Sequence, residues 1–116
     1  MSDNIPFAPA GAASDARLSA STNPSLNLAR IELPTLRLVL LCLETGQLSR
    51  AASIANLSVS GASHRLASLE HSLGTRLFRR HRRGLEATRA GAAVAAHGRQ
   101  MLGLVESLSE SLANLA

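Results

Sequence analysis

The fold is decided by one stretch of sequence, residues 46–91, which reads GQLSRAASIANLSVSGASHRLASLEHSLGTRLFRRHRRGLEATRAG. Its first part holds two apolar patterns at helical spacing, bounded by residues that begin or end helices. Its second part changes to a short arginine-rich run with a glycine turn, which is typical of a β-hairpin. Two helices followed by a basic hairpin are therefore the centre of the predicted domain.

A further helix is predicted before this stretch. It begins at Pro34, whose missing N–H costs little in a first turn, and ends at Gly46. Its apolar stripe is Leu36, Val39, Leu40 and Leu43. The next helix is short, with Ser49 predicted as its N-cap and Ile54 predicted to insert into the core.

The third predicted helix begins after Ser58 or Ser60, since either hydroxyl can accept a hydrogen bond from a first-turn N–H, and it ends at Gly74. One face is apolar and consists of Ala62, Leu66, Leu69 and Leu73. The opposite face is small and polar and consists of Ser60, Ser63, His64, Ala67 and His71. Because small side chains allow close approach, the helix can lie against another surface on this side.

A hairpin is predicted next, with strands at 76–80 and 85–87 joined by the turn Arg82-Arg83-Gly84. Two strands alone are marginal in water, so the hairpin must pack on the helices through its apolar residues. These are Leu77, Phe78 and Leu85. Glu70 is expected to pair with an arginine of the hairpin or the helices and to hold the core together.

A long final helix follows, which Thr88 is predicted to cap. It runs for about 28 residues, or about 42 Å at 1.5 Å per residue. Its apolar stripe is Val94, Met101, Val105, Leu108, Leu112 and Leu115, and the last five are spaced as in coiled coils. A helix this long extends beyond so small a core, so we expect the stripe to pair with a second chain rather than to fold back on its own domain.

Positive charge is concentrated in the middle of the chain. All twelve basic residues are arginine, and residues 34–91 hold nine of them against three glutamates. Five lie within the predicted hairpin: Arg76, Arg79, Arg80, Arg82 and Arg83. Guanidinium groups at this density can meet several phosphates at once, which favours a polyanionic partner. The plainer interpretation is a charged edge strand that discourages aggregation.

Composition argues against several other classes of protein. Two aromatic residues, Phe7 and Phe78, leave no platform for base stacking, and Cys42 alone permits no intramolecular disulfide. The histidines lack zinc spacing, so we expect no metal. The longest apolar run, residues 38–43, is far below the roughly 18–20 residues of a membrane span. We expect a cytoplasmic protein without a cofactor and, for want of a nucleophile–base pair or phosphate loop, not an enzyme.

The first 33 residues differ from the rest in composition. They hold three prolines, many Ser and Ala, and no sustained apolar period. Such a segment cannot bury enough apolar surface to offset its ordering entropy. Three regions are therefore predicted: a disordered or weakly ordered tail at 1–33, a compact domain at 34–88 and the final helix at 89–116.

Cys42, among leucines, is expected to be a small core residue of the compact domain.

Three short helices followed by a basic hairpin are the layout of a winged helix-turn-helix, a mainly α fold with the hairpin as its wing. In such folds the second helix of the motif enters the major groove of DNA and the first crosses the backbone. Here those helices would be residues 49–56 and 59–73. Phosphate contacts position a protein and base contacts specify the sequence, so the wing would do the first and the helix at 59–73 the second.

Residues 36–91 contain a series of residues that carries a family resemblance: Gly46, Ser49, Ala51-Ala52, Leu57-Ser58, Ser63, Leu66, Leu69-Glu70, Leu73-Gly74, Arg76-Leu77-Phe78, Arg80, Gly84, Thr88 and Ala90-Gly91. In residue type and in unbroken spacing, this series resembles the N-terminal DNA-binding domain of LysR-type transcriptional regulators. The resemblance implies sequence-specific binding of double-stranded DNA at a two-fold-related operator. It also implies a homodimer, with the final helix as the linker helix that pairs two subunits.

The predicted DNA contacts come from the motif and the wing: Ser49, Arg50, Ser60, Ser63, His64, Arg65, Ala67, Arg76, Arg79, Arg80, Arg82 and Arg83. Several positions depart from the family pattern. Val59-Ser60-Gly61 stands where Gln-Pro-Ala is frequent, His64 where Arg is common, and Gln47 where Ser is usual. Val59 cannot make the polar contact of a Gln, and Gly61 costs about 0.5–1 kcal/mol of helix stability relative to Ala.

The resemblance implies a much longer chain for members of the family, with a C-terminal domain that senses a small molecule. This chain ends within the linker helix, so no small-molecule effector is expected to bind it. An alternative function stays open, a truncated protein-interaction module that pairs with a full-length regulator without competent DNA readout. Val59 and Gly61 favour that alternative, and the arginine wing favours DNA binding.

Overall fold

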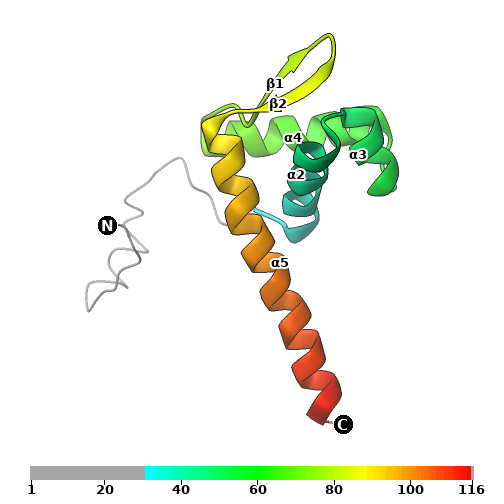
Figure 1. The fold of residues 1–116 in the computed structure, drawn as a ribbon, viewed down its shortest axis with the longest axis vertical. Helices are drawn as coiled ribbons and strands as arrows, with labels where there is room; N and C mark the ends of the chain where they lie inside the picture. Colours follow the sequence, from blue (N-terminus) through cyan, green and yellow to red (C-terminus); the bar gives the residue numbers. More distant parts are fainter. Residues whose placement is uncertain (1–30, 116) are drawn as a thin grey trace, which may run out of the picture.

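The computed structural model describes residues 31–115, which form four helices and a two-stranded hairpin (Figure 1). The elements in chain order are α2 (Leu33–Thr45), α3 (Leu48–Ile54), α4 (Val59–Leu73), β1 (Phe78–His81), β2 (Gly84–Ala87) and α5 (Arg89–Leu115). Helices α2, α3 and α4 form the body, the hairpin projects from it, and α5 runs away from it (Figure 1). This is the predicted winged helix-turn-helix. The prediction of a weakly ordered tail falls, for residues 1–30, outside the described residues.

The ends of the body helices follow the predicted signals. Helix α2 ends at Gly46 and helix α4 at Gly74, both in the left-handed conformation that suits glycine (φ 70° and 72°). Of the two serines considered for the start of α4, Ser58 is the N-cap, because its Oγ accepts a hydrogen bond from the Gly61 N–H at 3.0 Å. Local residue choice therefore sets the length of both helices.

The prediction that Ser49 caps the second helix is wrong. Helix α3 begins at Leu48, and its N-cap position is Gln47, which makes no side-chain capping bond. Ser49 lies inside the first turn. Thr45, the last residue of α2, orders this corner instead, since its Oγ1 accepts a hydrogen bond from the Gln47 N–H at 3.2 Å and donates one to the Leu41 carbonyl at 2.7 Å.

Two apolar residues, Ile54 of the predicted core and Leu43 of the predicted apolar stripe, are exposed. Ile54 is 50% exposed, because a turn of 100° per residue places it outside the narrow sector of α3, around Ala51 and Ala52, that is buried. Leu43 is exposed as well. The buried side chains of its helix, α2, lie at other positions, among them Leu38.

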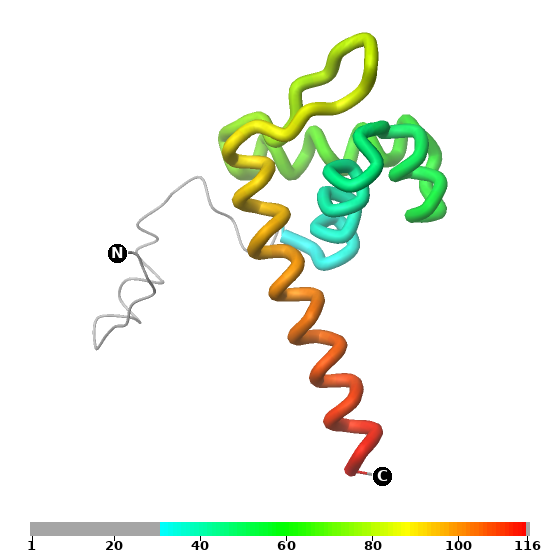
Figure 2. The backbone as a smooth tube through the Cα atoms, viewed as in Figure 1, coloured from blue at the N-terminus to red at the C-terminus, as the bar shows by residue number. Residues whose placement is uncertain are grey.

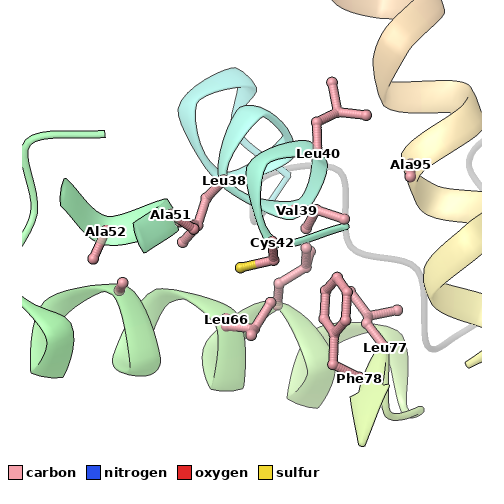
Figure 3. Packing of buried hydrophobic residues seen from close by; sticks show 12 residues of the cluster. Leu38, Val39, Leu40, Cys42, Ala51, Ala52, Leu66, Leu77, Phe78 and Ala95 are labelled. Carbon is pink, nitrogen blue, oxygen red and sulfur yellow. The ribbon is translucent and has the colours of Figure 1, made fainter. Parts of the chain in front are cut away.

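Helix α2 is the centre of the core because the other elements pack around it. It contacts α3 and α4 as well as α5 and the second strand of the wing. Figure 3 shows Cys42 directed towards α4, Leu38 beside Ala51 of α3, and Leu40 on the side of α5. Leu38, Val39 and Cys42 are fully buried. Burial raises the pKa of Cys42 to about 11, against a smaller opposite effect of Arg80. Cys42 is therefore the core residue that the sequence predicts.

Strands β1 and β2 form the predicted hairpin in antiparallel register. The first strand begins at Phe78, two residues later than predicted. The turn is reduced to Arg82-Arg83, because Gly84 already pairs with His81. Leu77 and Phe78 are buried and attach the hairpin to the helices, whereas the rest of β1 is exposed.

Glu70 joins helix α4 to the wing. Its Oε2 accepts hydrogen bonds from the Leu77 N–H at 2.7 Å and the Phe78 N–H at 3.3 Å, and it lies 3.6 Å from Nε of Arg76. The Glu70 side chain is only 11% exposed, so these partners take the place of water around its charge. The expectation that Glu70 pairs with an arginine is confirmed.

Helix α5 begins at the predicted cap and has two different halves. Thr88 Oγ1 accepts a hydrogen bond from the Gly91 N–H at 3.0 Å and donates one to the Arg76 carbonyl at 2.7 Å. The first turns pack on the core through Gly91, Ala95 and Gly98. The second half runs clear of the body (Figure 2). Its large apolar residues are exposed: Met101, Leu104, Val105, Leu108, Leu112 and Leu115.

Candidate nucleic-acid interface

The outer face of α4 and the base of the wing border one hollow in the surface. The hollow has a volume of about 600 Å³ and is lined by Ser63, Ala67, Glu70, His71, Gly74, Thr75, Arg76 and Arg80. Ser63 and Ala67 are predicted reading residues, and Arg76 and Arg80 are predicted phosphate-binding residues. The structure therefore brings members of the two predicted groups onto a single concave surface.

A second hollow adjoins the first on the other side of the same arginines. It has a volume of about 700 Å³ and is lined by Thr75, Arg76, Phe78, Arg79, Arg80, Thr88, Arg89 and Ala90. Arg76 and Arg80 line both hollows, so the two hollows form one arginine-lined surface that runs from the outer face of α4 across the wing to the start of α5. Arg89 is missing from the sequence-based set. Its only sequence signal is its position directly after the Thr88 cap of a helix that follows the wing.

The arginines of the wing are well placed for a polyanion because they are exposed. Arg79, Arg80, Arg82 and Arg83 all lie on the surface, the last two in the turn. Among residues 31–115, the ion pairs of the structure include only Arg76 from this group, through its contact with Glu70. Arg79, Arg80, Arg82 and Arg83 therefore form no ion pair with a carboxylate of the described residues, although Glu86 lies opposite Arg79 in the hairpin register.

The remaining predicted residues of α4 divide between two sides of the helix. Ser60 and His64 are exposed on the outer side, together with Ala67. Arg65 is turned to a different flank, where Nη1 lies 3.9 Å from Oε1 of Glu32. Arg65 lines neither hollow, in contrast to Ser63 two residues before it.

Ser49 and Arg50 are exposed on α3 and line neither of the two hollows. On α5, the predicted stripe is exposed from Met101 onward. Val94, by contrast, is half-buried against its own core.

Between residues 31 and 115, no three His, Cys, Asp or Glu side chains gather closely enough to hold a metal ion. None of the helices in the same range combines the length and apolar character of a membrane span.

A short helical motif, a basic wing beside its second helix and a long helix at the end define the class of winged helix-turn-helix DNA-binding domains. Residues 33–92 match the family model described as "Bacterial regulatory helix-turn-helix protein, lysR family". The chain belongs to the LysR family, and these residues are its helix-turn-helix DNA-binding domain.

Relatives in sequence are regulators of transcription. The chain is 38% identical over 87 residues to the HTH-type transcriptional regulator GbpR of Azospirillum brasilense, which covers 75% of this chain and 25% of GbpR. It is 34% identical over 85 residues to the HTH-type transcriptional activator AllS of Klebsiella pneumoniae, and the match covers 73% of this chain and 32% of AllS. The chain thus spans about a quarter to a third of these two relatives. The family is one of regulators and not of enzymes, as predicted.

Solved structures agree with the fold. The DNA-binding domain of CbnR, crystallised in complex with DNA, is 30% identical to this chain with a TM-score of 0.68, covering 74% of this chain and all of that one. The LysR family transcriptional regulator CbnR itself is 28% identical with a TM-score of 0.65, and the match covers 70% of this chain and 28% of CbnR. The predicted family and fold are both confirmed.

Proposed function

We propose that this chain binds double-stranded DNA sequence-specifically as the DNA-binding module of a LysR-type transcriptional regulator. In this proposal, residues 34–88 are the DNA-binding domain and residues 89–116 are the linker helix. Helix α4 enters the major groove while the wing lies on the phosphate backbone. The observation that supports it best is the shared hollow, in which Ser63 and Ala67 of α4 face the same space as Arg76 and Arg80.

The wing would position the protein on the duplex. Its exposed arginines, Arg79, Arg80, Arg82 and Arg83, offer forked donors that match phosphate oxygens. Arg76 and Arg89 extend this surface at the base of the wing. Because phosphates are the same at every step of DNA, these contacts add affinity without sequence preference.

Helix α4 would read the bases. Ser60, Ser63 and His64 can donate or accept hydrogen bonds at base edges, and Ala67 leaves room for close approach. Arg65 would exchange Glu32 for a phosphate or base, and the loss is small because exposed ion pairs contribute about 0–1 kcal/mol. Ser49 and Arg50 of α3 would contact the backbone, which the first helix of the motif crosses.

Helix α5 would join two copies of the chain. The exposed stripe at Met101, Val105, Leu108 and Leu112 follows the 4-3-4 spacing that packs one helix against another. Val94 would lie at the edge of this interface, since its own core already half covers it. A two-fold pair of chains presents two α4 helices, which suits an operator made of two related half-sites.

The alternative, an interaction module without DNA readout, is not favoured. One of its two supports is weakened by the structure. A Cβ at Gly61 would lie 3.0 Å from the Ser58 Oγ that caps α4, so glycine at this position accommodates the cap. Gly61 is therefore compatible with an intact recognition helix.

The test is selection of bound duplexes from a random pool by the 116-residue chain. We expect enrichment of one sequence with two related halves. Ser63→Ala and His64→Ala should change which bases are preferred, by about 1–3 kcal/mol at individual positions, more than they change overall affinity. A pool that shows no enrichment over many rounds with the wild-type chain would contradict the proposal.

A further inference from the structure

Val59 is an apolar residue at the exposed start of the helix proposed to read DNA. It is the first residue of α4 and is 50% exposed. The flanking residues Ser58 and Ser60 are short and polar, and Gly61 has no side chain. Val59 is thus the largest side chain in the first turn, and it does not belong to the apolar residues that pack against the core.

The position of Val59 along α4 relates it to the shared hollow. Val59, Ser63 and Ala67 are spaced four residues apart, so they form one row along the helix surface. Ser63 and Ala67 line the hollow together with Arg76 and Arg80. Val59 continues this row at the N-terminal end of α4, and in helix-turn-helix proteins that end of the recognition helix contacts base edges.

The chemistry of Val59 limits what it can recognise. Its side chain has no hydrogen-bond donor or acceptor and presents two methyl groups, whose directions are limited by the restricted χ1 of a β-branched residue. Among the base edges of the major groove, the apolar group is the C5-methyl of thymine. The bare first turn around Val59 leaves this methyl group free to approach.

We propose that Val59 is a specificity-determining residue that packs on the 5-methyl group of a pyrimidine, so that thymine is preferred at one position of each half-site. This inference rests on the proposed function. It specifies recognition by shape at the position where the family pattern has a glutamine. The same contact accepts 5-methylcytosine in preference to cytosine, because the methyl group is in the same place on the ring.

The test compares thymine with uracil in the selected duplex, since uracil lacks only the methyl group. Each thymine pair related by the two-fold is replaced in turn, and the Kd of the wild-type chain is measured. We expect one position at which uracil weakens binding by about fourfold per half-site, the effect of one buried methyl group. In Val59→Ala this ratio should fall close to one.

The control is Ile54→Ala. Ile54 is also 50% exposed and lies at the end of the preceding helix, outside the row of Val59. Its replacement should leave the thymine-to-uracil ratio unchanged. A ratio of one at every thymine with the wild-type chain, or an equal ratio in wild type and Val59→Ala, overturns the inference and leaves DNA binding standing. Failure of the wild-type chain to bind any duplex overturns the proposed function as well.

Discussion

The two halves of helix α5 are built from different residues for different surroundings. Where the helix crosses the core, its buried residues are Gly91, Ala95 and Gly98, which are small enough for backbones to come close. Where it leaves the body, large apolar residues such as Leu108 and Leu112 lie exposed. The first half therefore completes the fold of one chain, whereas the second half carries apolar surface that the described part of this chain does not cover.

The largest expected effect is on the packed half. A Cβ at Gly91 would lie 2.0 Å from the Leu77 carbonyl oxygen, so Gly91→Ala must push α5 away from the wing. We expect a loss of about 3 kcal/mol in the free energy of unfolding, measured by urea denaturation.

Gly103 on the same helix provides the matched control for Gly91. A Cβ at Gly103 would meet nothing within 4 Å. Gly103→Ala should therefore stabilise the protein by about 0.5–1 kcal/mol, because alanine loses less entropy in a helix. Equal effects of the two substitutions would show that the two halves of α5 do not differ in packing.

The next effect is on the projecting half. Leu108→Glu places a charge in the proposed apolar seam, and we expect it to weaken pairing of two chains by about 2–3 kcal/mol, or about 100-fold. Sedimentation equilibrium measures this directly. Ser107→Glu adds the same charge beside the stripe and should leave pairing nearly unchanged. A wild-type chain that is monomeric at high concentration would contradict the pairing.

A third prediction tests the packed region through Cys42. The chain has no lysine and no tyrosine, so Cys42 is the side chain that titrates between about pH 9 and 11. Because burial raises the pKa of the folded-state thiol to about 11, the stability that depends on the neutral thiol is fully present below about pH 9 and is lost as the pH rises towards 11.

We expect unfolding free energy to fall by about 2 kcal/mol across this range in the wild-type protein, measured by urea denaturation at several pH values. In Cys42→Ala the curve should be nearly flat. The same steep fall in both proteins would mean that another group is responsible.

The smallest effect is expected at the boundary between the halves. Met101 lines an apolar hollow of about 300 Å³ between α5 and the body, which it shares with Leu36, Leu73 and Val94 among others. Met101→Ala should therefore lower both the unfolding free energy and the pairing free energy, each by about 1 kcal/mol, because the residue is only partly buried. Thermal unfolding and sedimentation of the same sample measure the two effects.

Local signals in the sequence were sufficient for most element boundaries. Gly46 and Gly74 end helices, and Ser58 and Thr88 begin them, because each acts on backbone groups within a few residues of itself. The family spacing added the arrangement of these elements in space. The fold could therefore be predicted from residues 34–116 alone.

What could not be predicted depends on neighbours that are distant in sequence. The exposure of Ile54 follows from how little of α3 is covered by other helices, which its own pattern does not reveal. Arg65 meets Glu32, a residue outside the helix-turn-helix motif. Arg89 joins the basic surface only because α5 starts beside the wing. The missing information in each case was which distant parts of the chain lie next to the residue.

The central claim is that the wing arginines and the outer face of α4 contact the same DNA duplex at the same time. The most direct test measures how DNA affinity depends on salt for the wild type and for the double variant Arg80→Ala/Arg82→Ala. Arg99→Ala is the control, because Arg99 lies near Glu44, between α5 and α2 and away from the wing. We expect the slope of log K against log salt to become less steep by about 1.8 in the double variant, because each lost phosphate contact removes about 0.9. The control should keep the wild-type slope. An unchanged slope and affinity in the double variant would contradict the account.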